Sequence, residues 1–295
     1  MRIWIFTAAL GVAACSGETT DEAAPQNESP SAAETAVNGP DLRLYAMDCG
    51  RITMGDLSLF SSDGEYEGRE PHDAAVMCFL IRHAQGDLLW DSGLPDAFND
   101  AEDGVLNGPF TLSVPVPLLS QLKTIGVAPE DIEYYTISHS HFDHVGNSAM
   151  VADATLLIDA DERAYMFRDD ARADAETFGL VAPLEDAPTQ SFEGDLDVFG
   201  DGSVVILDMP GHTPGHKSLL VNLENAGPVL LSGDLYHLIE SRAREIVPSF
   251  NTDEAATRAS FARFEQIAED TGARVVIQHS LEHMDALPLA PKYLD

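Results

Sequence analysis

Residues 138–144 read Ser138-His139-Ser140-His141-Phe142-Asp143-His144 and follow directly on an apolar run over residues 132–137. Because side chains alternate along an extended chain, His139 and His141 should point to the same side. Imidazole nitrogens and carboxylate oxygens are suitable ligands for zinc and other borderline divalent ions. The stretch therefore predicts a metal site at the end of a strand, rather than a polar loop with clustered histidines.

Three further candidate ligands also follow apolar, strand-like runs. His212 lies in the sequence Pro-Gly-His-Thr-Pro-Gly-His over residues 210–216, Asp234 ends the sequence Ser-Gly-Asp, and His279 follows the run 274–278. A β-rich fold brings strand ends together at one edge, so these side chains can converge although they are distant in sequence. Taken singly, each histidine would more often be structural, but their joint placement favours a shared site.

Composition and charge limit the class of protein. A chain of 295 residues with 44% hydrophobic residues is expected to form a single domain of roughly 250 residues. The net charge of −34 argues against nucleic acid, an anionic membrane or a polyanion as the main partner. Much of this charge is expected on a solvated surface.

Apolar runs bounded by turn residues predict strands, and longer amphipathic segments predict helices. The strands are expected at 42–47, 76–83, 87–91, 132–137, 155–159, 203–207, 217–223, 229–232 and 274–278. The helices are expected at 118–125, 160–167 and 253–271, the last with Asn251 as N-cap and Gly272 as its stop. Residues 60–75, which include His72, and the apolar stretch 93–117 lack periodicity and are expected to form covering loops.

The first forty residues have the composition of an exported lipoprotein. Residues 1–14 form a short apolar signal-like segment, and Val12-Ala13-Ala14-Cys15 resembles a lipobox, with a frayed helix as the alternative. Residues 15–40 are expected to form a disordered acidic linker, and residues 41–295 the folded domain. We therefore expect a protein on the periplasmic side of a Gram-negative bacterium, touching the membrane only through a lipid anchor on Cys15.

The two remaining cysteines, Cys49 and Cys78, lie in or beside apolar segments. Export would permit a disulfide between them. Two cysteines in a chain of this size do not make a disulfide framework, so two small buried hydrophobic side chains are the preferred interpretation.

From about Leu42 to the C-terminus, the sequence resembles the metallo-β-lactamase superfamily of binuclear hydrolases through His-x-His-x-Asp-His, Pro-Gly-His-Thr-Pro-Gly-His, Ser-Gly-Asp and a late histidine. The resemblance implies an α+β fold, an αββα sandwich of two mixed β-sheets flanked by helices. It also implies that His139, His141 and His212 hold one metal, that Asp143, His144 and His279 hold the other, and that Asp234 bridges them. The cofactors would be two divalent ions, with zinc expected first and iron, cobalt or manganese also compatible with these ligands.

Within the superfamily, the pair Asp143-His144 separates this chain from the zinc β-lactamases, where arginine commonly takes the place of the histidine. The segments 42–50, 89–93 and 233–237 are most similar to N-acyl homoserine lactonases, the quorum-quenching branch. This resemblance implies that a metal-bridging hydroxide opens the lactone ring of a small neutral acyl lactone. Asp143 would relay the proton to the leaving group.

One position departs from the lactonase pattern. These enzymes commonly carry tyrosine three residues after the bridging aspartate, whereas this chain has His237 there, preceded by Tyr236. Neighbouring side chains on extended backbone point to opposite faces, so only one of the two should enter the site and contact the oxyanion.

Asp91 and His216 are expected to orient ligands or to make ordinary structural hydrogen bonds, and His83 and His283 are expected at the surface.

Two other functions fit the same residues. One is a promiscuous metallo-esterase, phosphotriesterase or β-lactam hydrolase of the same fold. The other is a metal-binding lipoprotein without catalysis. An apolar covering loop and open coordination positions favour an enzyme.

Overall fold

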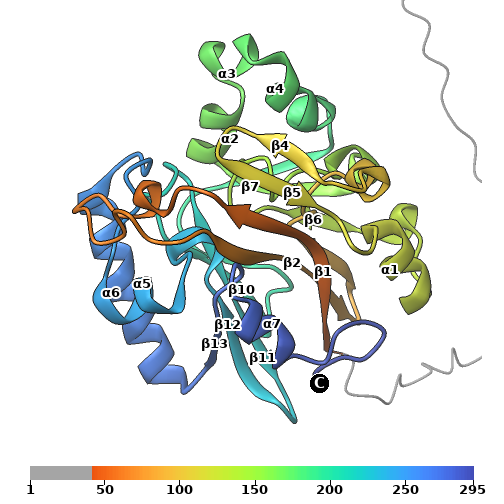
Figure 1. The fold of residues 1–295 in the computed structure, drawn as a ribbon. Coiled ribbons are helices and arrows are strands. Elements are labelled where there is room, and N and C mark those ends of the chain that lie inside the picture. Colours follow the sequence, from red (N-terminus) through yellow and green to blue (C-terminus); the bar gives the residue numbers. More distant parts are fainter. Residues whose placement is uncertain (1–41) are drawn as a thin grey trace, which may run out of the picture. The chain divides into compact units, whose positions relative to one another are not determined.

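The structure is a computed structural model that describes residues 42–295. Two β-sheets pack against each other, and helices lie on their outer sides, as Figure 1 shows. The strand order is β4-β5-β1-β2-β3-β6-β7-β8 in the larger sheet and β13-β12-β11-β10-β9 in the smaller. Both sheets contain parallel as well as antiparallel pairs. The αββα architecture implied by the resemblance is confirmed.

The bounds of the elements are as follows. The larger sheet consists of β1 (Arg43–Met54), β2 (His72–His83), β3 (Gly86–Trp90), β4 (Val105–Asn107), β5 (Phe110–Ser113), β6 (Tyr134–Thr136), β7 (Thr155–Asp159) and β8 (Thr189–Phe192). The smaller sheet consists of β9 (Leu196–Asp197), β10 (Val204–Asp208), β11 (Lys217–Leu223), β12 (Gly227–Leu231) and β13 (Arg274–Val276). The helices are α1 (Leu118–Ile125), α2 (Ala160–Met166), α3 (Asp169–Ala173), α4 (Ala175–Val181), α5 (Ile239–Arg244), α6 (Glu254–Thr271) and α7 (Leu281–Asp285).

Strand β2 shows how the layers form. Its run from Ala74 to Ile81 is buried throughout, as expected for a strand covered on both faces. Cys78 and Leu80 face the core shared with α1, whereas Phe79 and Ile81 face the core between the two sheets. Full burial of a side chain such as Phe79 contributes about 1.5–3 kcal/mol to stability.

Helix α6 covers the outer face of the smaller sheet through Phe261 and Phe264. It ends at Gly272, which adopts a left-handed conformation with φ of 64°, as expected. The predicted N-cap is wrong. Asp253 caps the helix by accepting a hydrogen bond from the backbone N–H of Ala256, and Asn251 is used elsewhere.

All predicted strands and the three predicted helices are present, and 118–125 and 217–223 match α1 and β11. Most other ends shift by a few residues, but β1 continues seven residues beyond the predicted end at 47. The two stretches expected as covering loops contain more structure than predicted. His72 begins β2, and the stretch 93–117 includes the β4–β5 hairpin, which joins the larger sheet by pairing β5 with β1. His83 and His283 are partly buried, since His83 stacks on Phe199 and His283 accepts a hydrogen bond from the Ile277 N–H.

Cys49 and Cys78 form a disulfide, so the preference for two free thiols is wrong. The antiparallel pairing of β1 with β2 sets Met47 opposite Cys78 and brings the two cysteine Cα atoms to 5.8 Å, within the range that a disulfide requires. The register of two strands separated by a long stretch of chain cannot be read from the cysteine positions alone.

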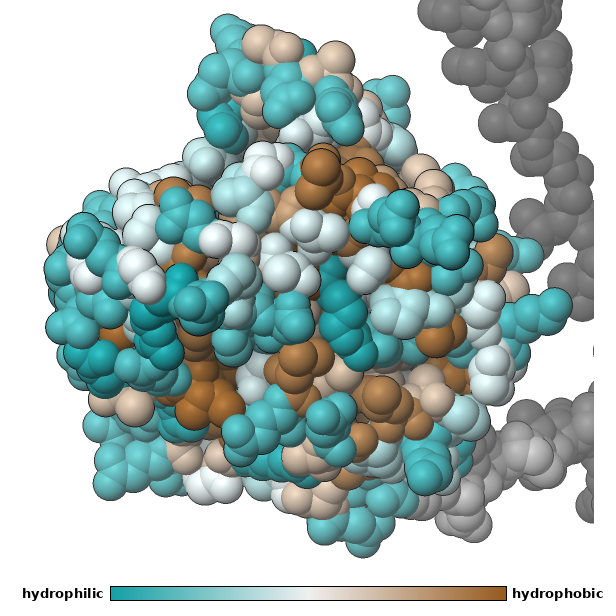
Figure 2. Space-filling model, viewed as in Figure 1, coloured by the Kyte–Doolittle hydropathy of each residue, from teal (hydrophilic) through white to brown (hydrophobic). Residues whose placement is uncertain are grey.

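The face of the molecule in Figure 2 is mostly hydrophilic, in keeping with the charge of the whole chain, and apolar side chains gather near the β4–β5 hairpin. Among residues 42–295, no helix is long and apolar enough to cross a membrane. The expected signal peptide (1–14) and linker (15–40) lie outside the described residues.

Candidate metal centre

Three imidazoles converge in the first group of candidate ligands, His139, His141 and His212. His139 Nε2 lies 2.8 Å from His141 Nδ1 and 3.1 Å from His212 Nε2, and the last two atoms are 3.0 Å apart. Burial lowers the pKa of His141 to about 4 and lowers those of His139 and His212 well below the usual value. The rings are therefore neutral, which is the form in which imidazole binds a metal.

The second group consists of Asp143, His144 and His279, all buried. Oδ2 of Asp143 lies 3.7 Å from His144 Nε2 and 3.5 Å from His279 Nε2. Burial alone would lower the pKa of both histidines. The carboxylates around them, Asp234 foremost, outweigh burial, so the pKa of His279 rises to about 9 and that of His144 rises well above its usual value. The neighbouring carboxylates therefore favour positive charge at these two positions.

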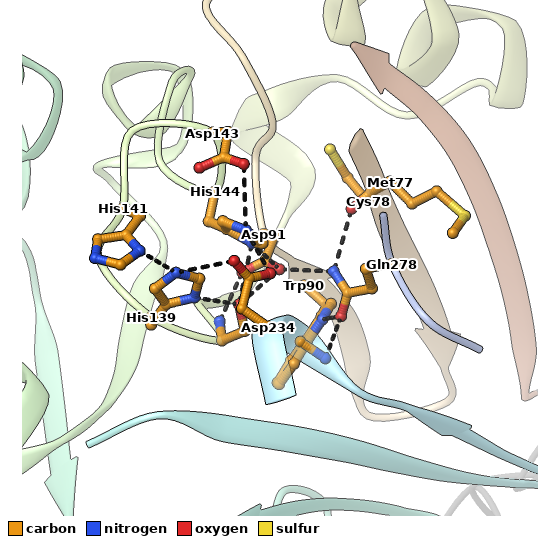
Figure 3. Close-up of polar contacts among 12 residues, drawn as sticks. Met77, Cys78, Trp90, Asp91, His139, His141, Asp143, His144, Asp234 and Gln278 are labelled. Carbon is orange, nitrogen blue, oxygen red and sulfur yellow. Dashed lines mark hydrogen bonds and ion pairs between the residues drawn. The ribbon is translucent and has the colours of Figure 1, made fainter. Parts of the chain in front are cut away.

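Asp234 lies between the two groups, at the centre of Figure 3. Its Oδ2 is 3.6 Å from His139 Nε2 and 3.5 Å from His212 Nε2. Its Oδ1 is 3.1 Å from His144 Nε2 and 2.9 Å from His279 Nε2. One carboxylate therefore offers a separate oxygen to each group of ligands, which is the arrangement needed to bridge two cations.

The polar atoms of this site fit divalent metals. Within the described part of the chain, the buried atoms His144 Nε2 and Asp234 Oδ1 have no hydrogen-bond partner, although each lies among other ligand atoms. An unpaired polar group in a buried site costs free energy, and a cation bound by these atoms would offset that cost. The set of imidazoles and carboxylates is suited to zinc and to neighbouring transition metals.

Neutral groups orient two of the ligands. His212 Nδ1 donates to Asn251 Oδ1 at 2.8 Å, and Asn251 in turn donates to Thr257 at 2.9 Å. His279 Nδ1 donates to the carbonyl oxygen of Ala75 at 2.7 Å. Both contacts leave Nε2 free to face the metal site. From its sequence position Asn251 was expected only as a helix cap, and its contact with His212 was not predicted.

Asp91 contacts the candidate ligand His144, which agrees with the expectation that it orients a ligand. The fully buried carboxylate accepts hydrogen bonds from His144 Nδ1 at 2.9 Å and from Gln278 Nε2 at 2.9 Å (Figure 3). It also accepts the backbone N–H of Ser138 at 2.6 Å. The backbone of Asp91 is left-handed, with φ of 58°, a conformation that non-glycine residues rarely adopt. Gln278 was not identified from the sequence.

His216 supports the turn that carries Asp234. Its Nδ1 donates to the Met209 carbonyl at 2.9 Å, and its Nε2 accepts the backbone N–H of Asp234 at 2.9 Å. Gly233 allows the approach, because a Cβ there would lie 2.7 Å from His216 Nε2. Burial lowers the pKa of His216 to about 4, which keeps the ring neutral and able to accept.

The structure brings His237 into the site and turns Tyr236 away from it. His237 Nε2 lies 3.1 Å from Asp234 Oδ2. The Tyr236 hydroxyl donates to Glu265 at 3.0 Å, and its ring stacks on Phe261 under α6. The expected oxyanion role therefore has no geometric support for Tyr236.

A pocket of about 320 Å³ opens beside these ligands. Its wall includes His141, Asp143, Asp234, His237 and His279. The rest of its lining is apolar: Ile52, Met54, Leu59, Phe60, Pro109, Phe110, Phe142 and Phe250. Part of this wall comes from the stretch 93–117, so the expectation that it covers something is confirmed.

Comparisons with known proteins agree with this geometry. The family model described as "Metallo-beta-lactamase superfamily" matches residues 73–279. The N-acyl homoserine lactonase AttM of Azorhizobium caulinodans is 30% identical over 269 residues, covering 86% of this chain and 99% of that protein. An N-acyl homoserine lactonase from a Bacillus species is 29% identical, covering 85% and 98%.

Solved structures give the same relationship. A structure of an N-acyl homoserine lactone hydrolase, with the product N-hexanoyl-L-homoserine bound at its catalytic metal centre, matches with a TM-score of 0.72 and 26% identity, covering 86% of this chain and 99% of that one. A Bacillus thuringiensis relative with N-decanoyl-L-homoserine bound at its active site matches with a TM-score of 0.70 and 25% identity, covering 86% and 99%. The chain belongs to the metallo-β-lactamase superfamily, and its predicted similarity to the N-acyl homoserine lactonase branch is confirmed.

Proposed function

We propose that this protein is a metal-dependent hydrolase that opens the lactone ring of N-acyl homoserine lactones, with two divalent ions held on either side of Asp234. The position of Asp234 carries the proposal. Its two oxygens face separate groups of ligands, and the same carboxylate lines the apolar pocket. The names of the relatives support the choice of substrate.

The pocket suits a neutral substrate with an acyl chain. Phe60, Phe110, Phe142 and Phe250 give it an apolar wall, and each methylene buried there contributes about 0.8 kcal/mol to binding. Ring opening by water turns the neutral lactone into a carboxylate and releases one proton. A protein with a net charge of −34 repels that product, which favours its release.

Two divalent ions, with zinc as the first expectation, would supply hydroxide from water at neutral pH and would polarise the lactone carbonyl. His237 lines the pocket, with its Nε2 3.1 Å from Asp234 Oδ2, and an N–H at that nitrogen would donate to the oxyanion that forms on the carbonyl oxygen. Asp143 lies on the same wall and can pass a proton to the ring oxygen as the C–O bond breaks.

The experiment is turnover of homoserine lactones with graded acyl chains, before and after chelation and after re-addition of metal. A simple ester, a phosphotriester and a β-lactam serve as comparison substrates. We expect metal-dependent hydrolysis with kcat/KM highest for the lactones and rising with chain length. Faster turnover of another substrate class would favour the promiscuous hydrolase, and tight metal binding without any turnover would favour the non-catalytic metal-binding lipoprotein.

We also propose that the protein is exported and lipid-anchored through Cys15. The apolar segment with its lipobox-like end supports this, and so does the Cys49–Cys78 disulfide, which fits an oxidising compartment. Metabolic labelling with a fatty acid should mark the wild-type protein and leave Cys15→Ala unlabelled. Equal labelling of both would contradict the anchor.

A further inference from the structure

A buried carboxylate outside the metal ligands connects two of the ligand loops. Glu162 lies in the first turn of α2 and is 1% exposed. The proposed chemistry does not use it, and nothing in the sequence motifs points to it. An ionised carboxylate at such depth is costly unless hydrogen-bond donors surround it.

Each oxygen of Glu162 binds a different loop. Oε1 accepts from the backbone N–H of Ser140 at 2.7 Å and from its hydroxyl at 2.6 Å. Oε2 accepts from the Thr213 hydroxyl at 2.6 Å and from the Gly215 N–H at 3.2 Å. Ser140 separates His139 from His141, and Thr213 directly follows His212. The carboxylate therefore joins the two loops that supply the first group of imidazoles.

The second loop is shaped to reach this carboxylate. A Cβ on Gly215 would lie 2.4 Å from the Glu162 backbone nitrogen and 2.6 Å from the Glu162 Cβ, so only glycine allows the loop to pack against the start of α2. The helix is itself fixed there by Asp159, which caps it and forms an ion pair with buried Lys217 at 2.6 Å. These contacts account for Thr213 and Gly215 of the motif, which are not candidate ligands.

We propose that Glu162 is a positioning residue that sets the spacing between His139 and His141 on one loop and His212 on the other, and thereby the affinity of the first metal site. The inference rests on the proposed metal-dependent function. Three imidazole nitrogens within 3.1 Å of one another leave little tolerance for movement of one loop against the other. The second group of ligands has no contact with Glu162 among those described, so its affinity should not change.

The test is the metal affinity of Glu162→Gln, measured with cobalt. Glutamine replaces one acceptor oxygen with an NH₂ group that would face hydrogen-bond donors, so one of the two loops loses its hydrogen bonds to residue 162. We expect the affinity of one of the two cobalt ions to fall about 10–100-fold, the other to be unchanged, and the d–d spectrum of the weakened site to change. Excess cobalt should restore kcat.

Gln121→Ala is the matched control. Gln121 is also buried and makes three hydrogen bonds between distant segments, to Asp48 and Val116, away from the metal ligands. The Gln121→Ala substitution should lower the melting temperature, while the affinities for both cobalt ions stay at wild-type values. If Glu162→Gln behaves in the same way, Glu162 is only structural and the proposal is overturned.

Thr213→Val provides a milder test if Glu162→Gln folds poorly. It removes one hydroxyl donor and leaves the carboxylate, so we expect a smaller loss of cobalt affinity at the same site. In the double variant Thr213→Val with Glu162→Gln, we expect no loss of affinity beyond that of Glu162→Gln alone. Independent, additive losses would overturn the proposal. Failure of the wild-type protein to bind two metal ions would instead contradict the proposed function itself.

Discussion

The two halves of the candidate metal centre are built on different principles. His139, His141 and His212 are neutral rings whose pKa values are lowered by burial, and a neutral amide, that of Asn251, orients one of them. The second half contains one carboxylate as ligand, Asp143, and a second, Asp91, against His144. The first half would therefore bind a metal through neutral imidazole nitrogens that converge on one point, whereas carboxylates would contribute more of the attraction in the second half.

Asp234 is the one residue that both halves share, so its substitution should have the largest effect. In Asp234→Asn, the shape is kept, but one oxygen and the charge between the two groups are lost. We expect metal content to fall below two ions per chain and kcat/KM to fall more than about a thousandfold, since metal activation supplies several kcal/mol. Metal analysis and lactone turnover measure both. Full activity with normal metal content would show that Asp234 does not bridge.

His237 separates catalysis from metal binding. Its ring lines the pocket and touches Asp234 but does not belong to either group of ligands. In His237→Phe we expect kcat to fall about a hundredfold, as for loss of one oxyanion donor, with two metal ions retained. Tyr236→Phe is the control, because that hydroxyl binds Glu265, and its turnover should stay at the wild-type value. A larger loss in Tyr236→Phe than in His237→Phe would reverse the assignment.

Asp91→Asn tests the role of charge in the second half. Asparagine tolerates the left-handed backbone at this position and keeps the shape of the side chain, but it removes the negative charge beside His144. We expect the affinity of the second metal alone to fall about 10–100-fold. Competition with a chelator, followed by metal analysis, gives both affinities. An equal loss at both sites would mean that the halves are not electrostatically distinct.

Asn251→Ala tests the role of orientation in the first half and should have the smallest effect. The change frees the His212 ring by removing the acceptor for its Nδ1–H, without altering charge. We expect about a tenfold loss of affinity at the first metal site only, near the lower end for loss of such a contact. The same chelator competition measures it, and a loss at the second site instead would contradict the division of the ligands.

The convergence of the candidate ligands could be predicted from the sequence, because each stands in a short motif at the end of an apolar strand. The hydrogen bonds that support these candidate ligands could not be predicted. Glu162 and Asn251 lie outside the ligand motifs, and Gln278, although next to His279, contacts the distant Asp91, so each acquires its role only when the sheets and loops pack together. The disulfide was missed for the same reason, since it depends on the register of β1 against β2.

Local rules succeeded where the outcome depends on neighbouring residues. The alternation of side chains along extended backbone predicted that only one of Tyr236 and His237 enters the site, but it did not determine which one. The helix end at Gly272 followed from local backbone chemistry. The helices α3, α5 and α7 were missed because five or six residues are too few to establish a helical period.

The most direct test of the account is a metal titration of chelated protein, with bound metal and hydrolysis of an N-acyl homoserine lactone measured on the same samples. We expect two ions to bind per chain, with full activity reached only when the second site is filled. Full activity with a single ion, or no lactone hydrolysis with two ions bound, would contradict it.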